Sequence, residues 1–213
     1  MDESWKTADS LAVPRFGPAD VERRDDECLY QGFFRMERRH LRHRLFNGGW
    51  SDEVVREVHI RHDAVGVLLY DVERDAVVLV EQIRAGALDD PESPWKLEVV
   101  AGLIENGDDP ADVARREAME EAGCDVGELY ELYTYYPSPG ACNERVRLYC
   151  GLVDTLGVGG VHGLDEENED IQVHIVPYPQ LNRLVEAGRL DNAMTLIAYQ
   201  WLARERASLR AAR

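Results

Sequence analysis

The chain has 213 residues, of which 45% are hydrophobic, and its formal net charge at pH 7 is −17. This length suits one substantial domain with a smaller one, and leaves enough apolar residues for a core. The acidic balance argues against a surface for nucleic acid or anionic membranes, and the sequence contains no run of 18 apolar residues that would predict a membrane span.

The amino-terminal sequence and the cysteines favour a cytoplasmic location. The opening MDESWKTADS has neither a basic region nor an apolar stretch, so no secretory signal is predicted. Cys28, Cys124, Cys142 and Cys150 form no CxxC pair. Scattered cysteines of this kind are typical of reduced thiols.

The first 61 residues predict a tail and a small module. Residues 1–26 are polar and are expected to form a loosely ordered tail. Short strands are expected around the basic run RRHLRHR (38–44) and in EVVREVHI (53–60), which predicts an antiparallel β module over residues 27–61. The basic run could attract phosphate, but an arginine-rich strand surface that balances an acidic protein is the favoured interpretation.

Residues 62–213 have the pattern of an α/β domain. Strongly apolar segments predict strands, and the end of the chain predicts two helices. The strands are expected at 64–70, 76–83, 96–102, 129–136, 145–153 and 171–176, and the helices at 179–187 and from 192 to about 209. A mixed sheet with helices on both faces, an α/β sandwich, is the predicted architecture.

A further helix is expected within GLIENGDDPADVARREAMEEAGC (102–124), after a glycine-rich turn. Asp109 is a natural N-cap residue, Pro110 suits the first helical position, and Gly123 suits the end of the helix. The sequence therefore predicts both ends of this helix from its capping residues.

Three glutamates of this helix, Glu117, Glu120 and Glu121, fall within an arc of about 100°. Their mutual repulsion costs ~0.2–0.5 kcal/mol per exposed pair, and a cation between them would turn that cost into binding. Hard divalent ions take oxygen ligands, and Mg²⁺ is usually shared between carboxylates and substrate phosphates. The alternative is a solvated helix face, in which Arg116 pairs with Asp112 and Glu120.

The segment resembles the Nudix box, the 23-residue signature of the Nudix hydrolases, which reads G, five residues, E, seven residues, REUxEExGU, with U a bulky apolar residue. The matching residues are Gly102, Arg116, Glu117, Glu120, Glu121 and Gly123. Asp108 stands where the first glutamate belongs, and Ala118 is small for its apolar position. Asp108 keeps the charge, and its shorter side chain affects the family's ion pair to Arg116 more than the metal site. The resemblance implies the Nudix α/β/α sandwich fold.

Segments outside the box resemble the ADP-ribose pyrophosphatase branch of this family. They are FNGGWSDEVVRE (46–57), EQIR (81–84), WKLEVVAG (95–102), SPGACNE (138–144) and ENED (167–170). Pro139 also follows Gly123 by sixteen residues, as a proline does in that branch. The likeness runs from about residue 28 to 201 and implies hydrolysis of ADP-ribose to AMP and ribose 5-phosphate by a homodimer, with Mg²⁺ as cofactor or Mn²⁺ as its substitute.

The resemblance also implies roles around the metal. The backbone carbonyl of Ala101, with Glu117 and Glu121, corresponds to the core Mg²⁺ site, and Glu120 supports it catalytically. The catalytic base corresponds to Glu167 on a loop that closes over the substrate, and Glu169 offers a further metal ligand. Which of Glu167 and Glu169 is the base stays open at this point.

Other residues correspond to substrate contacts. Arg84 and Arg56 resemble the contacts to the diphosphate and ribose, and Phe33 resembles the aromatic that stacks on adenine. In the family the amino-terminal module is exchanged across a two-fold dimer, so by this likeness Phe33 and Arg56 serve the partner subunit's site. Further candidates for the substrate pocket are Glu98, Ser138 and Glu144. A core role for Phe33 and a strand-capping role for Arg84 are the structural alternatives.

Two other functions remain open. The chain could hydrolyse a different nucleoside diphosphate sugar, such as GDP-mannose, or bind ADP-ribose without cleaving it, as a sensor that regulates transcription. The intact glutamates of the box, and the lack of an appended basic helix-turn-helix, weigh against the sensor.

Overall fold

The computed structural model describes residues 14–164 and 168–212. The chain divides into two compact units. The smaller unit comprises the residues up to Ile60 together with Gly140–Cys142, and the larger comprises Arg61–Pro139 and Asn143–Arg213. The division falls beside the predicted boundary between residues 61 and 62.

The smaller unit is an antiparallel sheet built around one long central strand. Its strands are β1 (Val21–Arg23), β2 (Glu27–Gln31), β3 (Arg35–His43) and β4 (Val54–Ile60). β1 and β2 pair with one edge of β3, and β4 pairs with the other. An antiparallel module was predicted here and is confirmed. The difference is β1, which the sequence placed in the tail: Val21 lies opposite His43, and the backbone ladder to β3 makes this polar segment a strand.

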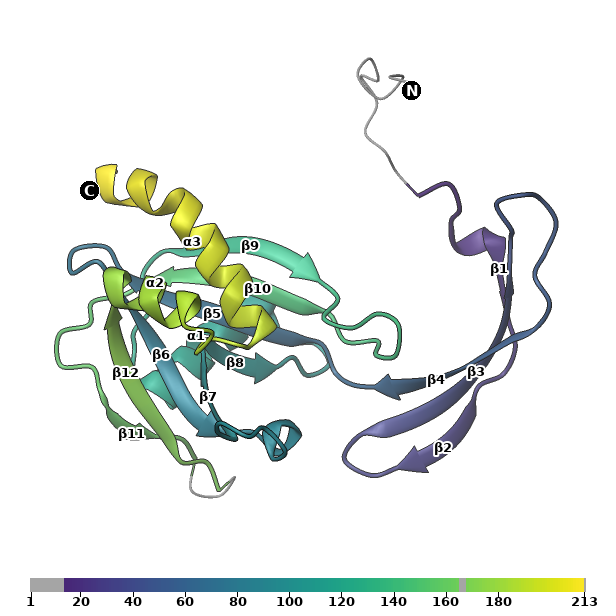
Figure 1. The fold of residues 1–213 in the computed structure, drawn as a ribbon, viewed down its shortest axis with the longest axis horizontal. Coiled ribbons are helices and arrows are strands. Elements are labelled where there is room, and N and C mark those ends of the chain that lie inside the picture. Colours follow the sequence, from purple (N-terminus) through teal and green to yellow (C-terminus); the bar gives the residue numbers. More distant parts are fainter. Residues whose placement is uncertain (1–13, 165–167, 213) are drawn as a thin grey trace, which may run out of the picture. The chain divides into compact units, whose positions relative to one another are not determined.

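The larger unit contains an eight-stranded mixed sheet (Figure 1). Six strands follow in the order β11-β12-β6-β5-β10-β9, while β7 pairs with β6 and β8 with β5. β5 and β10 are parallel, and the other pairs are antiparallel. The strands are β5 (Ala64–Asp71), β6 (Ala76–Ile83), β7 (Trp95–Glu98), β8 (Val100–Leu103), β9 (Leu129–Tyr135), β10 (Val146–Leu152), β11 (Gly160–His162) and β12 (Ile171–Pro177).

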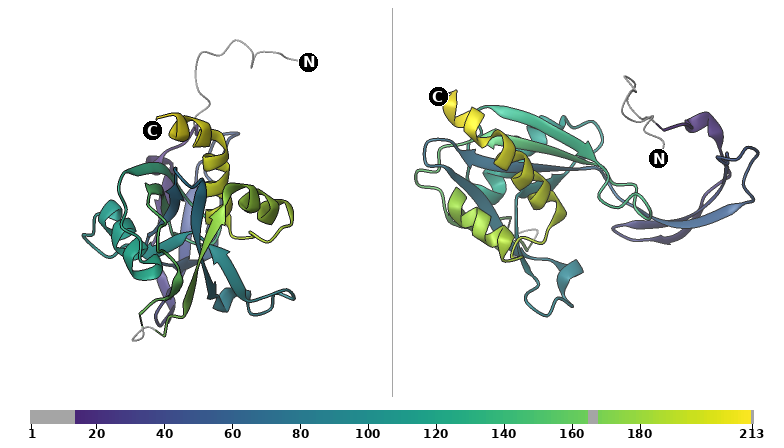
Figure 2. Two further views of the ribbon diagram at one scale, coloured as in Figure 1. Left: turned by 90° about the vertical axis from the view of Figure 1, so that its left-hand side faces the viewer. Right: turned by 45° about the horizontal axis from the view of Figure 1, so that its top comes forward.

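Helices cover both faces of this sheet (Figures 1 and 2). α1 (Pro110–Ala122) packs on one face, where its buried alanines share a core cluster with Val65, Val67, Val78 and Val80. The opposite face is covered by α2 (Tyr178–Glu186) and α3 (Ala193–Ala211). Because both faces are covered, β5 is buried along its whole length, and its sequence is apolar from Ala64 to Tyr70. The predicted α/β/α sandwich with a mixed sheet is confirmed.

The two central strands separate at one end, and the chain between them positions the site. β5 and β6 pair only through 69–71 and 76–78. Further along, β7 pairs with β6 at Val80–Ile83, and β8 pairs with β5 at Ala64–Val67. The chain therefore crosses from β6 to β5 between β7 and β8, and Glu98 lies at this crossing.

The helix ends follow from the capping residues. The Asp109 carboxylate accepts a hydrogen bond from the backbone N–H of Ala111 (2.8 Å), and Gly123 ends α1 in the left-handed conformation with φ of 62°. Asn192 caps α3 in the same way, because its Oδ1 accepts from the backbone N–H of Thr195 (3.0 Å).

Candidate active site

Glu117 of α1 lies against β8. If Gly102 carried a Cβ atom, that atom would be 2.2 Å from Oε1 of Glu117. The carboxylate of Glu117 therefore occupies the space that a side chain at position 102 would need, so this packing requires a glycine there. The close approach brings a carboxylate next to the backbone of residues 101–103.

Glu121, one turn along α1, is 4% exposed, and its Oε2 accepts a hydrogen bond from the backbone N–H of Ala101 (3.2 Å). Burial raises the pKa of Glu121 to about 8. The Glu117 and Glu169 carboxylates act in the same direction, whereas the Ala101 N–H and the Arg84 guanidinium oppose the rise. A cation beside Glu121 would oppose the effect of burial and favour the ionised carboxylate.

Arg116 holds two of the helix glutamates. Its Nη2 lies 3.0 Å from Oε1 of Glu117, and its Nη1 lies 3.1 Å from Oε2 of Glu120. Asp108 instead accepts a hydrogen bond from the backbone N–H of Glu105 (3.3 Å). Within the described ranges Asp108 makes no ion pair with Arg116, in keeping with its side chain being shorter than glutamate.

Arg84 and Glu98 form an ion pair at the crossing between β7 and β8. The Arg84 Nε donates to Oε2 of Glu98 (2.6 Å), and the Asn192 Nδ2 donates to Oε1 of the same carboxylate (2.5 Å). Glu98 is 6% exposed. The sequence identified Arg84 and Glu98 as candidates but not Asn192, whose only signal was its position at the start of the last predicted helix.

The acidic loop before β12 contributes Glu169. Its Oε2 accepts from the backbone N–H of Leu164 (3.2 Å), and its negative charge acts, less than burial does, to raise the pKa of Glu121. Glu167 lies outside the described residues. The choice of catalytic base between Glu167 and Glu169 therefore stays a prediction.

The residues around Glu121 fit a divalent cation that a substrate helps to bind. Across residues 14–164 and 168–212, no three His, Cys, Asp or Glu side chains are grouped tightly enough to enclose a metal ion by themselves. Mg²⁺, however, is usually held by one or two carboxylates together with waters and substrate phosphates. Glu117, Glu121 and the Ala101 carbonyl supply hard oxygen donors of that kind, and the charge of Glu117 already acts on the Glu121 carboxylate.

The structure gives the remaining candidates other contacts. Ser138 is exposed in the loop after β9, while Glu144 is buried and pairs with Arg61 (3.3 Å). Phe33 and Arg56 belong to the smaller unit. Phe33 is 84% exposed and meets Phe34 edge to face, and the Arg56 Nη1 donates to the Val55 carbonyl (2.8 Å).

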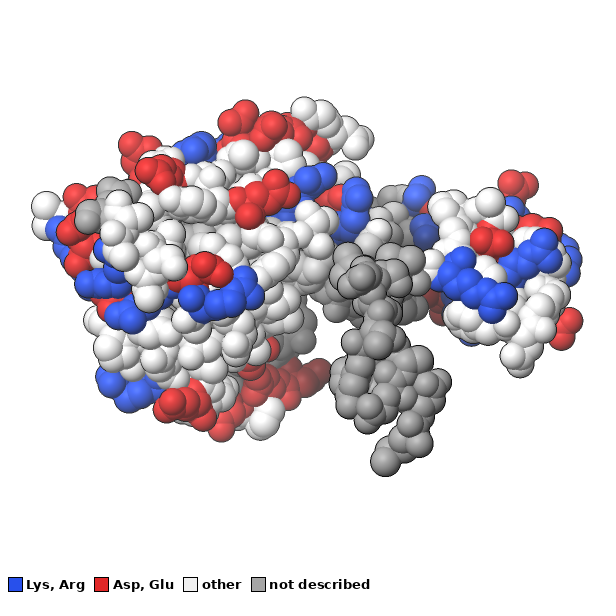
Figure 3. Space-filling view, turned by 90° about the horizontal axis from the view of Figure 1, so that it is seen from above, with Lys and Arg blue, Asp and Glu red and all other residues white. Residues whose placement is uncertain are grey.

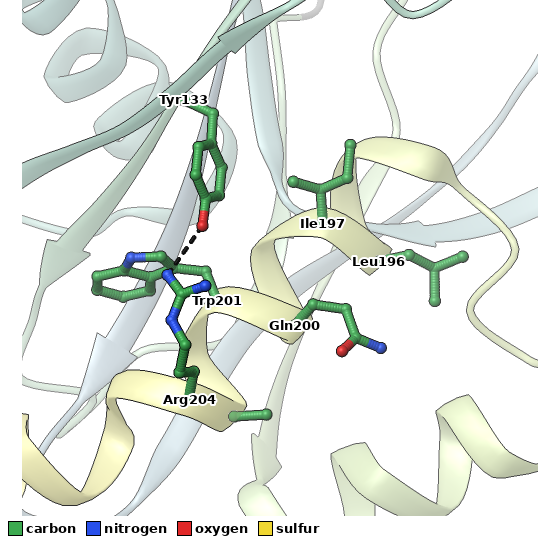
Figure 4. A pocket seen from close by; sticks show the side chains of 7 residues that line it. Tyr133, Leu196, Ile197, Gln200, Trp201 and Arg204 are labelled. Carbon is green, nitrogen blue, oxygen red and sulfur yellow. Dashed lines mark hydrogen bonds between the residues drawn. The ribbon is translucent and has the colours of Figure 1, made fainter. Parts of the chain in front are cut away.

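The larger unit also has a hollow of about 680 Å³ between α3 and β9 (Figure 4). The Arg204 Nη2 donates to the Tyr133 hydroxyl across it (2.9 Å), and Trp201 lies alongside. It is lined by Tyr133, Leu196, Ile197, Gln200, Trp201, Ala203 and Arg204. None of these corresponds to a predicted site residue.

The surface charges of the larger unit are mixed. Basic and acidic side chains lie beside one another on the face in Figure 3. Many arginines are paired, for example Arg145 with Asp63 and Arg74 with Asp71, each at 2.8 Å. Over the residues that the structure describes, no helix has the length and apolar character to cross a membrane.

This chain belongs to the NUDIX family, because the model of the NUDIX domain matches residues 60–197. Among its curated relatives is the ADP-ribose pyrophosphatase of Escherichia coli (strain K12), which is 50% identical over 91% of this chain and 92% of the relative. The ADP-ribose pyrophosphatase of Haemophilus influenzae is 44% identical over 89% of each chain. The predicted likeness to Nudix hydrolases of the bacterial ADP-ribose pyrophosphatase branch is confirmed.

Two further matches are more distant. A GDP-mannose pyrophosphatase of Escherichia coli (O1:K1 / APEC) is 32% identical over 69% of this chain and 76% of the relative. The crystal structure of an ADP compounds hydrolase matches with a TM-score of 0.66 and 20% identity, over 92% of this chain and 96% of the other. This last match supports the fold.

Proposed function

We propose that this chain hydrolyses the diphosphate of ADP-ribose to AMP and ribose 5-phosphate, with Mg²⁺ as its cofactor. The observation that carries the proposal is that the carboxylate of Glu117 and the buried carboxylate of Glu121 act on one another, with the ion-paired Arg84 also acting on Glu121, because this offers a cation site near a guanidinium that can bind a diphosphate. The relatives named ADP-ribose pyrophosphatase, at 50% and 44% identity over nearly the whole chain, support this substrate.

We assign a separate role in binding or catalysis to each residue of the site. Glu117, Glu121 and the Ala101 carbonyl would hold Mg²⁺, and Glu120 keeps Arg116 in place beside them. The cation, when bound, stabilises negative charge on the phosphate oxygens and lowers the pKa of bound water. Arg84 binds the diphosphate through its planar guanidinium. A carboxylate of the acidic loop, Glu167 or Glu169, takes the proton of the attacking water.

We further propose that the protein is a homodimer assembled through the smaller unit. In the described part of that unit, the acidic Glu37 is the single buried residue. Large apolar side chains are exposed instead, among them Phe33 (84%), Phe46 (74%) and Tyr30 (62%). A four-stranded sheet without an apolar core of its own requires a covering surface, and a second copy of the chain supplies one. Light scattering should give about twice the chain mass of 24.2 kDa, whereas a monomer at every concentration would contradict the dimer.

Complementation tests the sharing of sites between subunits. Arg56→Ala and Arg84→Ala are each expected to be nearly inactive. If Arg56 serves the partner's site, refolding the two variants together restores about one quarter of the wild-type activity, because half of the dimers are mixed and one of their two sites is intact. No recovery would place both arginines in the same subunit's site.

A substrate panel tests the reaction itself. ADP-ribose, GDP-mannose, ADP-glucose and NADH are incubated with the enzyme and Mg²⁺ or Mn²⁺, and the products are separated by chromatography. We expect AMP and ribose 5-phosphate from ADP-ribose, with the highest kcat/KM of the panel. Preference for GDP-mannose would favour the alternative that the 32% identical relative suggests. Binding of ADP-ribose without cleavage would indicate a sensor. The cytoplasmic location, like the identity of the base, stays a prediction.

A further inference from the structure

We infer that Asn192 is a positioning residue for substrate binding, which acts by holding Glu98 and, through Glu98, the guanidinium of Arg84. The inference rests on the proposed function, in which Arg84 contacts the diphosphate. Asn192 lies 108 positions after Arg84 in the chain and is the N-cap of α3, a helix on the face of the sheet opposite α1.

Each oxygen of the Glu98 carboxylate has one donor. Oε2 accepts from the Arg84 Nε (2.6 Å) and Oε1 from the Asn192 Nδ2 (2.5 Å). Glu98 is 6% exposed, so water cannot readily replace either donor. A buried carboxylate that loses one donor either turns toward solvent or rotates to share the donor that remains. Both responses would change the direction in which Arg84 points.

The orientation of the Asn192 amide is fixed from the other side. Its Oδ1 accepts from the backbone N–H of Thr195 (3.0 Å) and from the Thr195 hydroxyl (3.3 Å), which turns Nδ2 toward Glu98. The Thr195 hydroxyl in turn accepts from the backbone N–H of Val99 (3.1 Å). The first turn of α3 therefore holds both the side chain of Glu98 and the backbone of the next residue.

The side chain of Arg84 is exposed enough that its conformation depends on the ion pair with Glu98. Its side chain is 42% exposed, whereas that of Glu98 is 7% exposed. A half-exposed arginine samples many rotamers, and an ion pair with a fixed carboxylate selects one of them before substrate binds. Asn192 would thus lower the entropy cost of binding the diphosphate, which affects KM more than kcat.

A merely structural role for Asn192 would be to cap α3, and the test separates the two roles. Asn192→Ser and Asn192→Asp both keep an oxygen for the helix cap, but neither can donate to Glu98 as the amide does. Arg189→Ala is the matched control: Arg189 lies on the same connector between α2 and α3, and its ion pair with Glu92 is largely exposed and touches neither Glu98 nor Arg84.

The experiment measures kcat and KM for ADP-ribose from pH 6 to pH 8.5, each relative to wild type, with unfolding midpoints alongside. We expect Asn192→Ser to raise KM about tenfold at every pH, with kcat within about threefold. The new carboxylate of Asn192→Asp faces Glu98, repels it and offers it no donor, so we expect its KM to rise at least as much. Arg189→Ala stays at wild-type values.

Wild-type kinetics for both serine and aspartate variants across this pH range would overturn the inference, as would a fall in kcat with KM unchanged. If the serine variant is unstable, the aspartate variant, which is an equally good cap, decides the question. A wild-type enzyme that does not cleave ADP-ribose would instead reject the proposed function, and the two failures are therefore distinct.

Discussion

The carboxylate of Glu117 lies where a side chain on Gly102 would have to be, 2.2 Å from the expected Cβ position. A contact under about 3 Å between non-bonded heavy atoms requires one group to move. The first glycine of the box is therefore a packing partner of the helix glutamate, and its small size sets where that carboxylate sits relative to β8.

Gly102→Ala should therefore displace Glu117 and lower kcat/KM at least about 100-fold, a loss of about 2.7 kcal/mol of transition-state stabilisation. Steady-state kinetics with ADP-ribose and Mg²⁺ measure it. Gly127→Ala is the matched control, because its Cβ would make an ordinary contact of 3.4 Å with the Leu152 carbonyl. Equal activities for the two variants would show that the position of Glu117 is unimportant.

Arg116 should matter more for turnover than Asp108. Arg116→Ala removes the cation that holds Glu117 and Glu120, so we expect kcat to fall about 10- to 100-fold with little change in stability, since the arginine is half exposed. Asp108→Ala loses one hydrogen bond in the turn before α1 and should keep kcat within about threefold. The opposite ranking in the same assay would show that Asp108 has a direct role in the site.

Divalent cations should stabilise the folded protein through Glu121. Mg²⁺ at 100 times its Kd adds about 2.7 kcal/mol to the free energy of unfolding, and urea titrations with and without the cation measure this gain. Glu121→Gln should abolish most of the gain, because it removes a charged ligand. Glu81→Gln, a partly exposed residue of β6 that pairs with His174, is the control and should retain it. A cation effect that survives in Glu121→Gln would locate the metal elsewhere.

Because of Asp71, the free energy of unfolding of the larger unit should decrease at acid pH. Burial acts to raise the pKa of Asp71, but hydrogen bonds from Thr155 and Arg74 outweigh it and hold the pKa well below its ordinary value. A depressed pKa means that the stabilisation is complete above the ordinary value and is lost as the pH falls below about 4. Asp71→Asn should cost about 2–4 kcal/mol of unfolding free energy at pH 7.

The difference between wild type and Asp71→Asn should shrink as the pH falls from 5 to 2, because in this range the Asp71 carboxylate of the unfolded wild-type chain takes up a proton while that of the folded chain stays ionised. Urea unfolding at a series of pH values measures the difference. A gap that stays constant with pH would mean that the hydrogen bonds of Asp71 contribute independently of its charge.

Several features of the fold and of the site could be predicted from short-range sequence patterns. The ends of α1 follow from Asp109 and Gly123, and the apolar run of β5 reflects a strand covered on both faces. The arrangement of Glu117 and Glu121 on one side of a helix follows from helical spacing alone. Val21–Arg23 were missed, because a short polar segment becomes a strand only through its partner β3.

The sequence by itself determined the helix that bears the glutamates, the strands of the sheet and the family, because these depend on spacing between neighbours in the chain. Only the tertiary structure decided that Glu121 is buried against the Ala101 backbone and that Asn192 reaches Glu98. Both contacts are made to the chain that crosses from β6 to β5: Glu121 of α1 contacts it from one face of the sheet, and Asn192 at the start of α3 contacts it from the other. Such contacts join residues far apart in sequence, and no local sequence pattern predicts which of these residues the packing of the sheet brings together.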